Sequence, residues 1–208
     1  MLKILGKASS INVRKVLWTC AEIDLAFELN EFGSGTPNAI DTPEFLALNP
    51  NGMVPVIQND EGTLWESNTI CRYLATRYQR VDLLPQNAML RAQVEKWMDW
   101  QATELNNAWR YAFMATVRHS AAHQNSDAIA HSVREWNRHM AILDQRLQTT
   151  QAFVGGEQFS LADIVLGLSL NRWRSAPIAH ATLPALDAYF ERLSLRPGFL
   201  KYGANGIA

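Results

Sequence analysis

The pattern of apolar and polar positions changes once along this chain, near residue 80. Before that point short alternating runs are interleaved with helical spacing, which is typical of a small α/β layer. The expected strands cover 2–5, 26–32, 54–57 and 63–65, and the expected helices cover 13–23, a short segment from 42 and 66–78. After that point we expect only helices, over 89–116, 127–147, 161–173 and 183–193. The pattern therefore predicts an α/β domain at 1–80, a linker at 81–87 and an all-helical domain at 88–208.

Local signals mark where three of these elements begin or turn. Thr42-Pro43-Glu44 is typical of a helix start, with Thr42 as the N-cap and proline at the first helical position. Asn59-Asp60-Glu61-Gly62 is a turn between two strands. Ser160-Leu161-Ala162-Asp163 is similar to a capping box, and Phe159 and Ile164 are placed as its hydrophobic staple. We interpret this last signal as structural.

Composition narrows the class of protein. With 208 residues, 48% hydrophobic and 19% charged, the chain is long enough to bury a core. Its net charge of −1 without a basic stripe argues against nucleic acid as a partner. No apolar run reaches the length of a membrane span, and the N-terminus lacks a signal-peptide pattern. We therefore expect a cytoplasmic protein without a membrane partner.

Cysteine and histidine give no sign of a metal or dithiol centre. Cys20 and Cys71 lie in helical apolar patterns, so we expect two small buried hydrophobes. They form no CxxC motif, and no cluster has the spacing of metal ligands. The histidines are scattered, and we expect them on solvated helix faces: His119, His123, His131, His139 and His180.

The most informative segment is 49–56, followed by Glu66-Ser67. Val54-Pro55 between short strands predicts a turn at which an extended backbone edge is left unpaired. Glu66-Ser67 opens a helical pattern, and the N-terminus of a helix offers free N–H groups and partial positive charge to a carboxylate. A strand edge beside an anion site is suited to a small peptide-like ligand.

With these motifs in order, the chain resembles cytosolic glutathione transferases over essentially its whole length. The resemblance rests on three motifs: Asn49-Pro50-Asn51-Gly52-x-Val54-Pro55, Glu66-Ser67 and Ser160-x-x-Asp163. A fourth motif, Ser10-x-Asn12-x-x-Lys15-Val16, is similar to that of the serine-type bacterial branch, which is theta-, phi- and nu-like. It implies a thioredoxin-like N-terminal domain, an all-α C-terminal domain, a homodimer, and glutathione as co-substrate without a metal.

The resemblance implies that Ser10 donates a hydrogen bond to the glutathione sulfur and that Asn12 assists through its amide. A free thiol has a pKa near ~8.5, so the site must favour the thiolate. The hydroxyl and the dipole of the following helix, at about 1–2 kcal/mol each, would together lower this pKa by roughly one to two units. Ser9 is a rival for the same role. On local sequence alone, Ser10 is also a plain helix N-cap.

Glutathione binding is assigned, also by resemblance, to residues near the predicted edge. Val54 would pair its backbone with the cysteinyl unit, as in strand addition, beside a cis Pro55. Ser67 would hold the γ-glutamyl carboxylate and Glu66 its ammonium. Asp99 would reach the same ammonium in a neighbouring subunit, or is a plain surface carboxylate.

The chain departs from the family at the glycyl end of the tripeptide. It has no Lys, Arg or His from Val16 to Cys71, and Met53 stands where many relatives carry a polar or basic residue. A missing charge-assisted hydrogen bond costs about 1.5–3 kcal/mol. We expect weak glutathione affinity, a modified thiol ligand, or donors from elsewhere: Thr36, Asn38, Asn49, Asn51, Lys7, Arg72 or Arg110.

The electrophile would lie against the helical domain. The candidates are Ser9, Trp109, Arg110, Phe113, Met114 and Trp173. A stripe of aromatic residues is more often core than pocket, and we interpret Trp97 and Trp100 as core or interface. Arg110 interrupts the aromatic face and would orient an anionic substrate, or it is a solvated helix charge.

Together these features favour a detoxifying glutathione transferase. In such an enzyme the thiolate attacks an electrophilic carbon of a small substrate that is hydrophobic or anionic. One rival is a glutathione-dependent disulfide or peroxide reductase, in which Ser10 and Asn12 stabilise a thiolate leaving group. Another is a non-catalytic binding protein of the same fold. An isomerase that uses glutathione as cofactor ranks low, because Ser9-Ser10-Ile11 lacks the Ser-Ser-Cys cluster typical of that branch.

Overall fold

The computed structural model describes residues 1–206, and it confirms the predicted fold class. The N-terminal part contains β1 (Leu2–Leu5), α1 (Ile11–Glu22), β2 (Phe27–Asn30), α2 (Pro43–Leu48), β3 (Val56–Asn59), β4 (Gly62–Trp65) and α3 (Ser67–Arg77). The remainder contains α4 (Ala88–Trp100), the π-helix η1 (Gln101–Leu105), α5 (Asn106–Thr116), α6 (Ser126–Thr150), α7 (Leu161–Ser175), α8 (Pro184–Ser194) and the π-helix η2 (Phe199–Gly203). The domain boundaries at residues 80 and 88, with the linker between them, stay a prediction.

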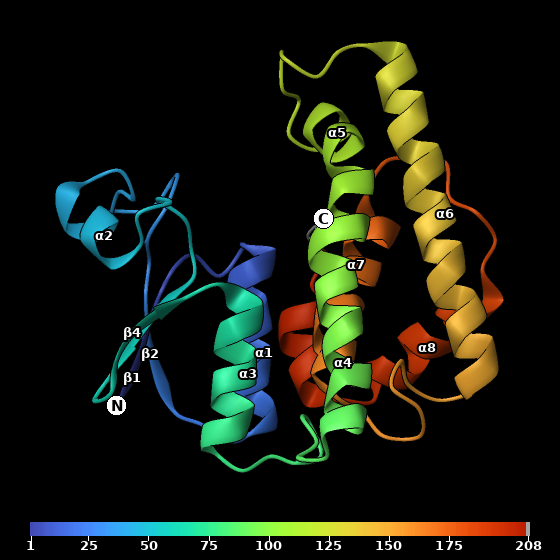
Figure 1. The fold of residues 1–208 in the computed structure, drawn as a ribbon. Coiled ribbons are helices and arrows are strands. Elements are labelled where there is room, and N and C mark those ends of the chain that lie inside the picture. Colours follow the sequence, from blue (N-terminus) through green and yellow to red (C-terminus); the bar gives the residue numbers. More distant parts are fainter. Residues whose placement is uncertain (207–208) are drawn as a thin grey trace.

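The four strands form one mixed sheet in the order β2-β1-β3-β4. The central strand β1 is parallel to β2 and antiparallel to β3, with Ile4 opposite Leu29 and Ile57. Helices α1 and α3 lie between the sheet and the helical domain, and α2 lies on the other side (Figure 1). The thioredoxin-like layer is thus covered on both faces.

Trp18 of α1 joins the two domains. It is fully buried and packs against Phe159 and Phe199, with ring centroids 5.8 and 5.2 Å away. Two glycines make room for the indole, because an added Cβ would lie 3.1 Å from the ring at Gly167 and 2.5 Å from it at Gly198. This packing fixes α1, which carries the candidate catalytic residues, against α7.

In the central helix α7 every residue from Leu161 to Trp173 is buried, and only the last two residues of the helix are not. The predicted capping box is present at its start, where the Asp163 carboxylate accepts hydrogen bonds from the Ser160 N–H (2.8 Å) and hydroxyl (3.0 Å). The same carboxylate also accepts from the Val154 N–H and the Tyr189 hydroxyl, both at 2.8 Å. These bonds compensate for burial, which raises the pKa of Asp163.

Three predicted elements differ from those observed. The helix expected at 89–116 is interrupted by η1, because apolar spacing over so short a stretch does not reveal a wider turn. The strand expected at 54–57 begins at Val56, since Pro55 has no N–H for the ladder. The strand expected at 26–32 is limited to Phe27–Asn30, the four residues that pair with β1.

One side chain expected on a solvated face is buried. His139 is only 5% exposed, its ring lies 5.7 Å from that of Trp100, and its Nδ1 lies 2.7 Å from the Glu135 carbonyl oxygen.

Cys20 and Cys71 are buried free thiols, as expected. Between residues 1 and 206 no helix combines the length and apolar character that a membrane span requires.

Candidate active site

A small cavity of about 90 Å³ lies where the N-terminal ends of α1 and α3 meet the turn before β3. Its lining residues are Asn12, Asn49, Asn51, Met53, Val54, Pro55, Glu66 and Ser67. The structure thus brings together five predicted glutathione-binding residues and Asn12. It adds Asn49 and Asn51, which the sequence offered only as substitute donors.

The Val54 edge is available for strand addition. The Val54-Pro55 peptide bond is cis, as predicted. Among the described residues, the backbone N–H and C=O of Val54 have no hydrogen-bond partner. Gly6 allows the loop after β1 to approach this edge, because a Cβ there would lie 3.2 Å from that of Val54 and 2.5 Å from Val13.

The turn before this edge is held by Asn49. Its Nδ2 donates to the Met53 carbonyl at 2.8 Å, and its Oδ1 accepts from the Asn51 N–H at 3.1 Å. Gly52 has a φ of +59°, a conformation that favours glycine. The asparagine-rich motif therefore positions the edge through its own hydrogen bonds.

The N-terminal end of α3 forms the opposite wall. Glu66 occupies the N-cap position with a φ of +74° and makes no side-chain cap bond. Ser67 begins the helix and is only 6% exposed. Since the first N–H groups of a helix have no partner within it, this wall offers donors and partial positive charge to a carboxylate.

Ser10 occupies the N-cap position of α1, but its hydroxyl makes no cap hydrogen bond. Its N–H donates to the Lys7 carbonyl at 3.0 Å, and its carbonyl accepts from the Arg14 N–H at 2.9 Å. The side chain is half-buried, whereas that of Ser9 is exposed. The plain N-cap role is therefore not observed, and the Ser10 hydroxyl remains available to a ligand.

Of the described residues that line this cavity, none has a basic side chain. Lys7 donates instead to the Ser34 carbonyl at 2.9 Å, and Arg72 forms ion pairs with Glu95 and Asp99. Asp99 is 64% exposed despite this pair. The donors near the expected glycyl end are neutral amides.

The predicted electrophile residues fall into two groups. Trp109 is half-buried and packs edge-on against Phe113, with centroids 5.2 Å apart, and Met114 is also half-buried. Arg110 on the same helix is exposed. Trp173 on α7 is buried, and its indole N–H donates to Asn137 of α6 at 3.0 Å. Helical spacing on α7 could not show which side faces α6.

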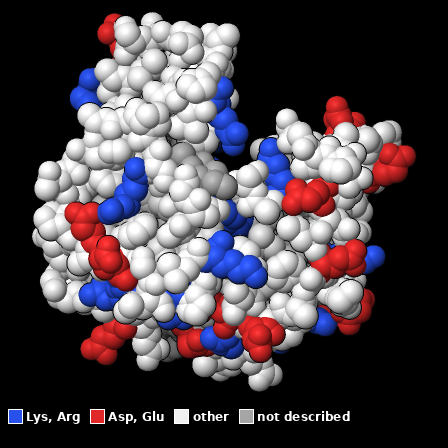
Figure 2. Space-filling model, turned by 180° about the vertical axis from the view of Figure 1, so that it is seen from behind, with Lys and Arg blue, Asp and Glu red and all other residues white. Residues whose placement is uncertain are grey.

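Two buried basic residues next to these groups were not predicted as site residues. Arg172 lies over the rings of Trp109 and Phe113, at 4.6 and 4.3 Å. Burial and then the charges of Arg14 and Arg118 lower the pKa of Arg172 to about 9. Burial lowers the pKa of Lys15 to about 8. Figure 2 shows a notch between the two lobes, with Lys and Arg side chains on both of its walls.

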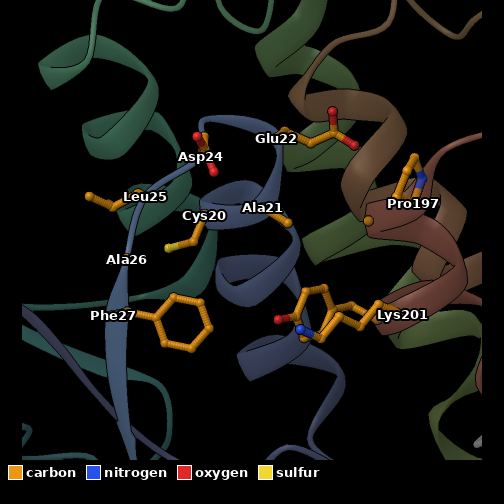
Figure 3. A pocket seen from close by; sticks show the side chains of 11 residues that line it. Cys20, Ala21, Glu22, Asp24, Leu25, Ala26, Phe27, Pro197 and Lys201 are labelled. Carbon is orange, nitrogen blue, oxygen red and sulfur yellow. The ribbon is translucent and has the colours of Figure 1, made fainter.

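A second, wider cavity of about 410 Å³ lies at the other end of α1. Figure 3 shows Cys20, Phe27 and Lys201 around it, from α1, β2 and the C-terminal segment. None of the predicted site residues lines this cavity.

Comparison with known proteins identifies the family. The model of the glutathione S-transferase N-terminal domain matches residues 9–77, and that of the C-terminal domain matches residues 126–192. Glutathione S-transferase GstB of Escherichia coli (strain K12) is 35% identical over 207 residues, which cover 97% of each chain.

Solved structures agree with this result. A theta class glutathione S-transferase from Xanthomonas axonopodis pv. citri, with glutathione bound, has a TM-score of 0.91 and 35% identity and covers 100% of this chain and 99% of its own. Glutathione transferase F7 from Populus trichocarpa has a TM-score of 0.86 and 27% identity, with 100% coverage of both chains. The chain belongs to the glutathione S-transferase family, and it is a glutathione S-transferase enzyme.

Proposed function

We propose that this chain binds glutathione in the cavity at the N-terminal ends of α1 and α3 and joins its sulfur to the electrophilic carbon of a small substrate, so that the whole glutathionyl group is transferred. The observation that carries the proposal is the unpaired backbone of Val54 facing the N-terminal end of α3. Such an edge pairs with the cysteinyl unit of the tripeptide. Ser67 and the first N–H groups of α3 then receive the γ-glutamyl carboxylate, and Glu66 receives the ammonium.

The reaction starts when the bound thiol loses its proton to solvent. The Ser10 hydroxyl, which makes no cap bond, donates to the resulting thiolate, and Asn12 supports it from the first turn of α1. The sulfur lone pair forms a bond to the electrophilic carbon. The leaving group departs with its bonding electrons, or the electrons of an activated double bond move away from the carbon.

We place the electrophile against Ser9, Trp109, Arg110, Phe113 and Met114. Half-buried Trp109 offers part of its indole, backed by the buried ring of Phe113. Exposed Arg110 offers charge to an anionic substrate. Trp173 is left out of this proposed surface because its buried indole N–H is already bonded to Asn137.

We also propose a homodimer and a cytoplasmic location. Large apolar side chains are exposed around the connection between α3 and α4: Tyr78, Val81, Met89 and Leu90. A two-fold partner on this surface would cover them and would bring Asp99 towards the neighbouring site.

Calorimetric titration with glutathione tests the binding site. Replacing Ser67→Ala removes one hydrogen bond to a charged group, and we expect the Kd to rise roughly 10- to 100-fold. Ser9→Ala, with an exposed side chain beside the site, is the matched control and should leave the Kd within about threefold. No binding at millimolar glutathione, or equal Kd values for Ser67→Ala and the native chain, would contradict the proposal.

A further inference from the structure

A charged lysine is buried at the junction of the two domains. Lys15 of α1 is only 2% exposed, and its Nζ donates to Asn68 Oδ1 at 3.1 Å and to Gln101 Oε1 at 2.8 Å. Both acceptors are neutral. No carboxylate of residues 1–206 lies within ion-pair distance of this ammonium. A buried charge without a counter-charge is costly, so its presence calls for an explanation.

The position of Lys15 relative to the small cavity explains why a charge is buried here. Asn68 directly follows Ser67, the residue proposed to hold the γ-glutamyl carboxylate, and Lys15 lies one helical turn after Asn12. Both Ser67 and Asn12 line the small cavity. The ammonium is thus bonded to the neighbour of one lining residue, and Lys15 follows another lining residue by one turn of α1. The bound tripeptide would place a carboxylate and a thiolate at these two residues.

The second acceptor of the Lys15 ammonium, Gln101, belongs to the helical domain. Gln101 begins η1, and its Nε2 donates to Asn106 Oδ1 at 2.8 Å. That oxygen also accepts from Trp109 Nε1 at 3.1 Å. Single π-turns inside helices are frequent at functional sites. Lys15 therefore connects the glutathione cavity with the aromatic face proposed for the electrophile.

We propose that Lys15 is a positioning residue of the glutathione site, whose buried ammonium is the counter-charge of the bound tripeptide and favours its thiolate form. The inference rests on the proposed function above. It explains why no carboxylate of residues 1–206 pairs with this ammonium, since bound glutathione brings negative charge with it. Asn68 and Gln101 hold the ammonium in place.

The proposal has a pH dependence with a defined sign. Burial lowers the pKa of Lys15 to about 8; the Cys71 thiol and Glu66 raise it, and Arg172 and Arg72 lower it. These groups come from α3 and its N-cap position and from α7. A bound anion favours the protonated lysine, so affinity is full below a pH of about 8 and falls as the pH rises through that value.

The test uses Lys15→Met and Lys15→Arg, after a thermal melt has established which variants fold. The ultraviolet absorbance of the thiolate, followed against pH, gives the pKa of bound glutathione. We expect Lys15→Met to raise that pKa by about one unit, a tenfold loss in ionisation, and Lys15→Arg to restore most of it. A folded Lys15→Met variant with the native thiol pKa and native affinity for S-methylglutathione would overturn the proposal.

S-methylglutathione provides a second measurement that does not need Lys15→Met to fold. This ligand has no thiol proton, so between about pH 7 and about pH 9 the affinity of the native chain should fall more steeply than that of Lys15→Arg, which stays charged. Equal pH slopes would contradict the role of Lys15. Absence of glutathione binding to the native chain would instead contradict the proposed function.

Discussion

The two ends of α1 offer an instructive comparison, because each borders a cavity. The cavity at the last turn holds about 410 Å³ and is lined by Cys20, Ala21, Glu22 and segments 24–27, 197–198 and 201–202. The cavity at the first turn holds only about 90 Å³. The small one has an unpaired strand edge and the N-termini of two helices. Ser10, whose hydroxyl makes no cap bond, occupies the N-cap position of α1 and is not among the lining residues.

This difference supports our placement of the glutathione site in the small cavity, because the placement rests on the groups that each cavity presents and not on its volume. At the last turn of α1 the helix presents carbonyl groups, and Glu22 is already paired with Arg196 at 2.6 Å. At the first turn the helix presents N–H groups and partial positive charge, which suit the anionic groups of a peptide ligand. A narrow cleft that a peptide completes by strand addition need not be spacious in the free protein.

The largest expected effect is at the first turn of α1. Ser10→Ala removes the proposed hydrogen bond to the thiolate, and we expect kcat/KM for conjugation to an aryl halide to fall about 10- to 100-fold. Affinity for S-methylglutathione should change less than about threefold, since a thioether sulfur is only a weak acceptor. Steady-state kinetics and calorimetry measure the two quantities. A matching loss in Ser9→Ala with an unchanged KM for the aryl halide would show that the wrong serine has been assigned, whereas a raised KM would reflect the proposed contact of Ser9 with the electrophile.

A smaller, opposite effect is expected at Met53, which is 60% exposed and lines the small cavity. Met53→Lys places an ammonium near the expected glycyl carboxylate, and the Kd for glutathione should fall only about 2- to 5-fold, because solvent screens an exposed pair. Met53→Gln is the neutral control. With glutathione ethylated at its glycyl carboxylate the gain should disappear. If the gain persists with that ester, the glycyl end lies elsewhere.

The sequence predicted those parts of the site that depend on local motifs. The Val54-Pro55 edge, the Glu66-Ser67 helix start and the Ser160-Asp163 capping box each lie within a few residues and follow from turn and cap chemistry. The prediction of the fold rested on the order and spacing of these motifs along the chain, and not on any single motif. The resemblance to a family then placed Ser10 near them.

Features made by packing between distant segments could not be predicted in this way. The orientation of Trp173 depends on where α6 lies, and the π-helix η1 depends on contacts that leave no mark on apolar spacing. Lys15 stood in the quoted Ser10-x-Asn12-x-x-Lys15 motif, but only the fold brings Asn68 and Gln101, 53 and 86 residues later, to its ammonium.

A crystal structure of the chain with S-methylglutathione tests the central claim most directly. The account predicts the ligand in the small cavity, with its cysteinyl backbone paired to Val54, its γ-glutamyl carboxylate at Ser67 and its sulfur beside Ser10. A ligand seated at the last turn of α1 (Figure 3), or one bound without contact to Val54 and Ser67, would contradict it.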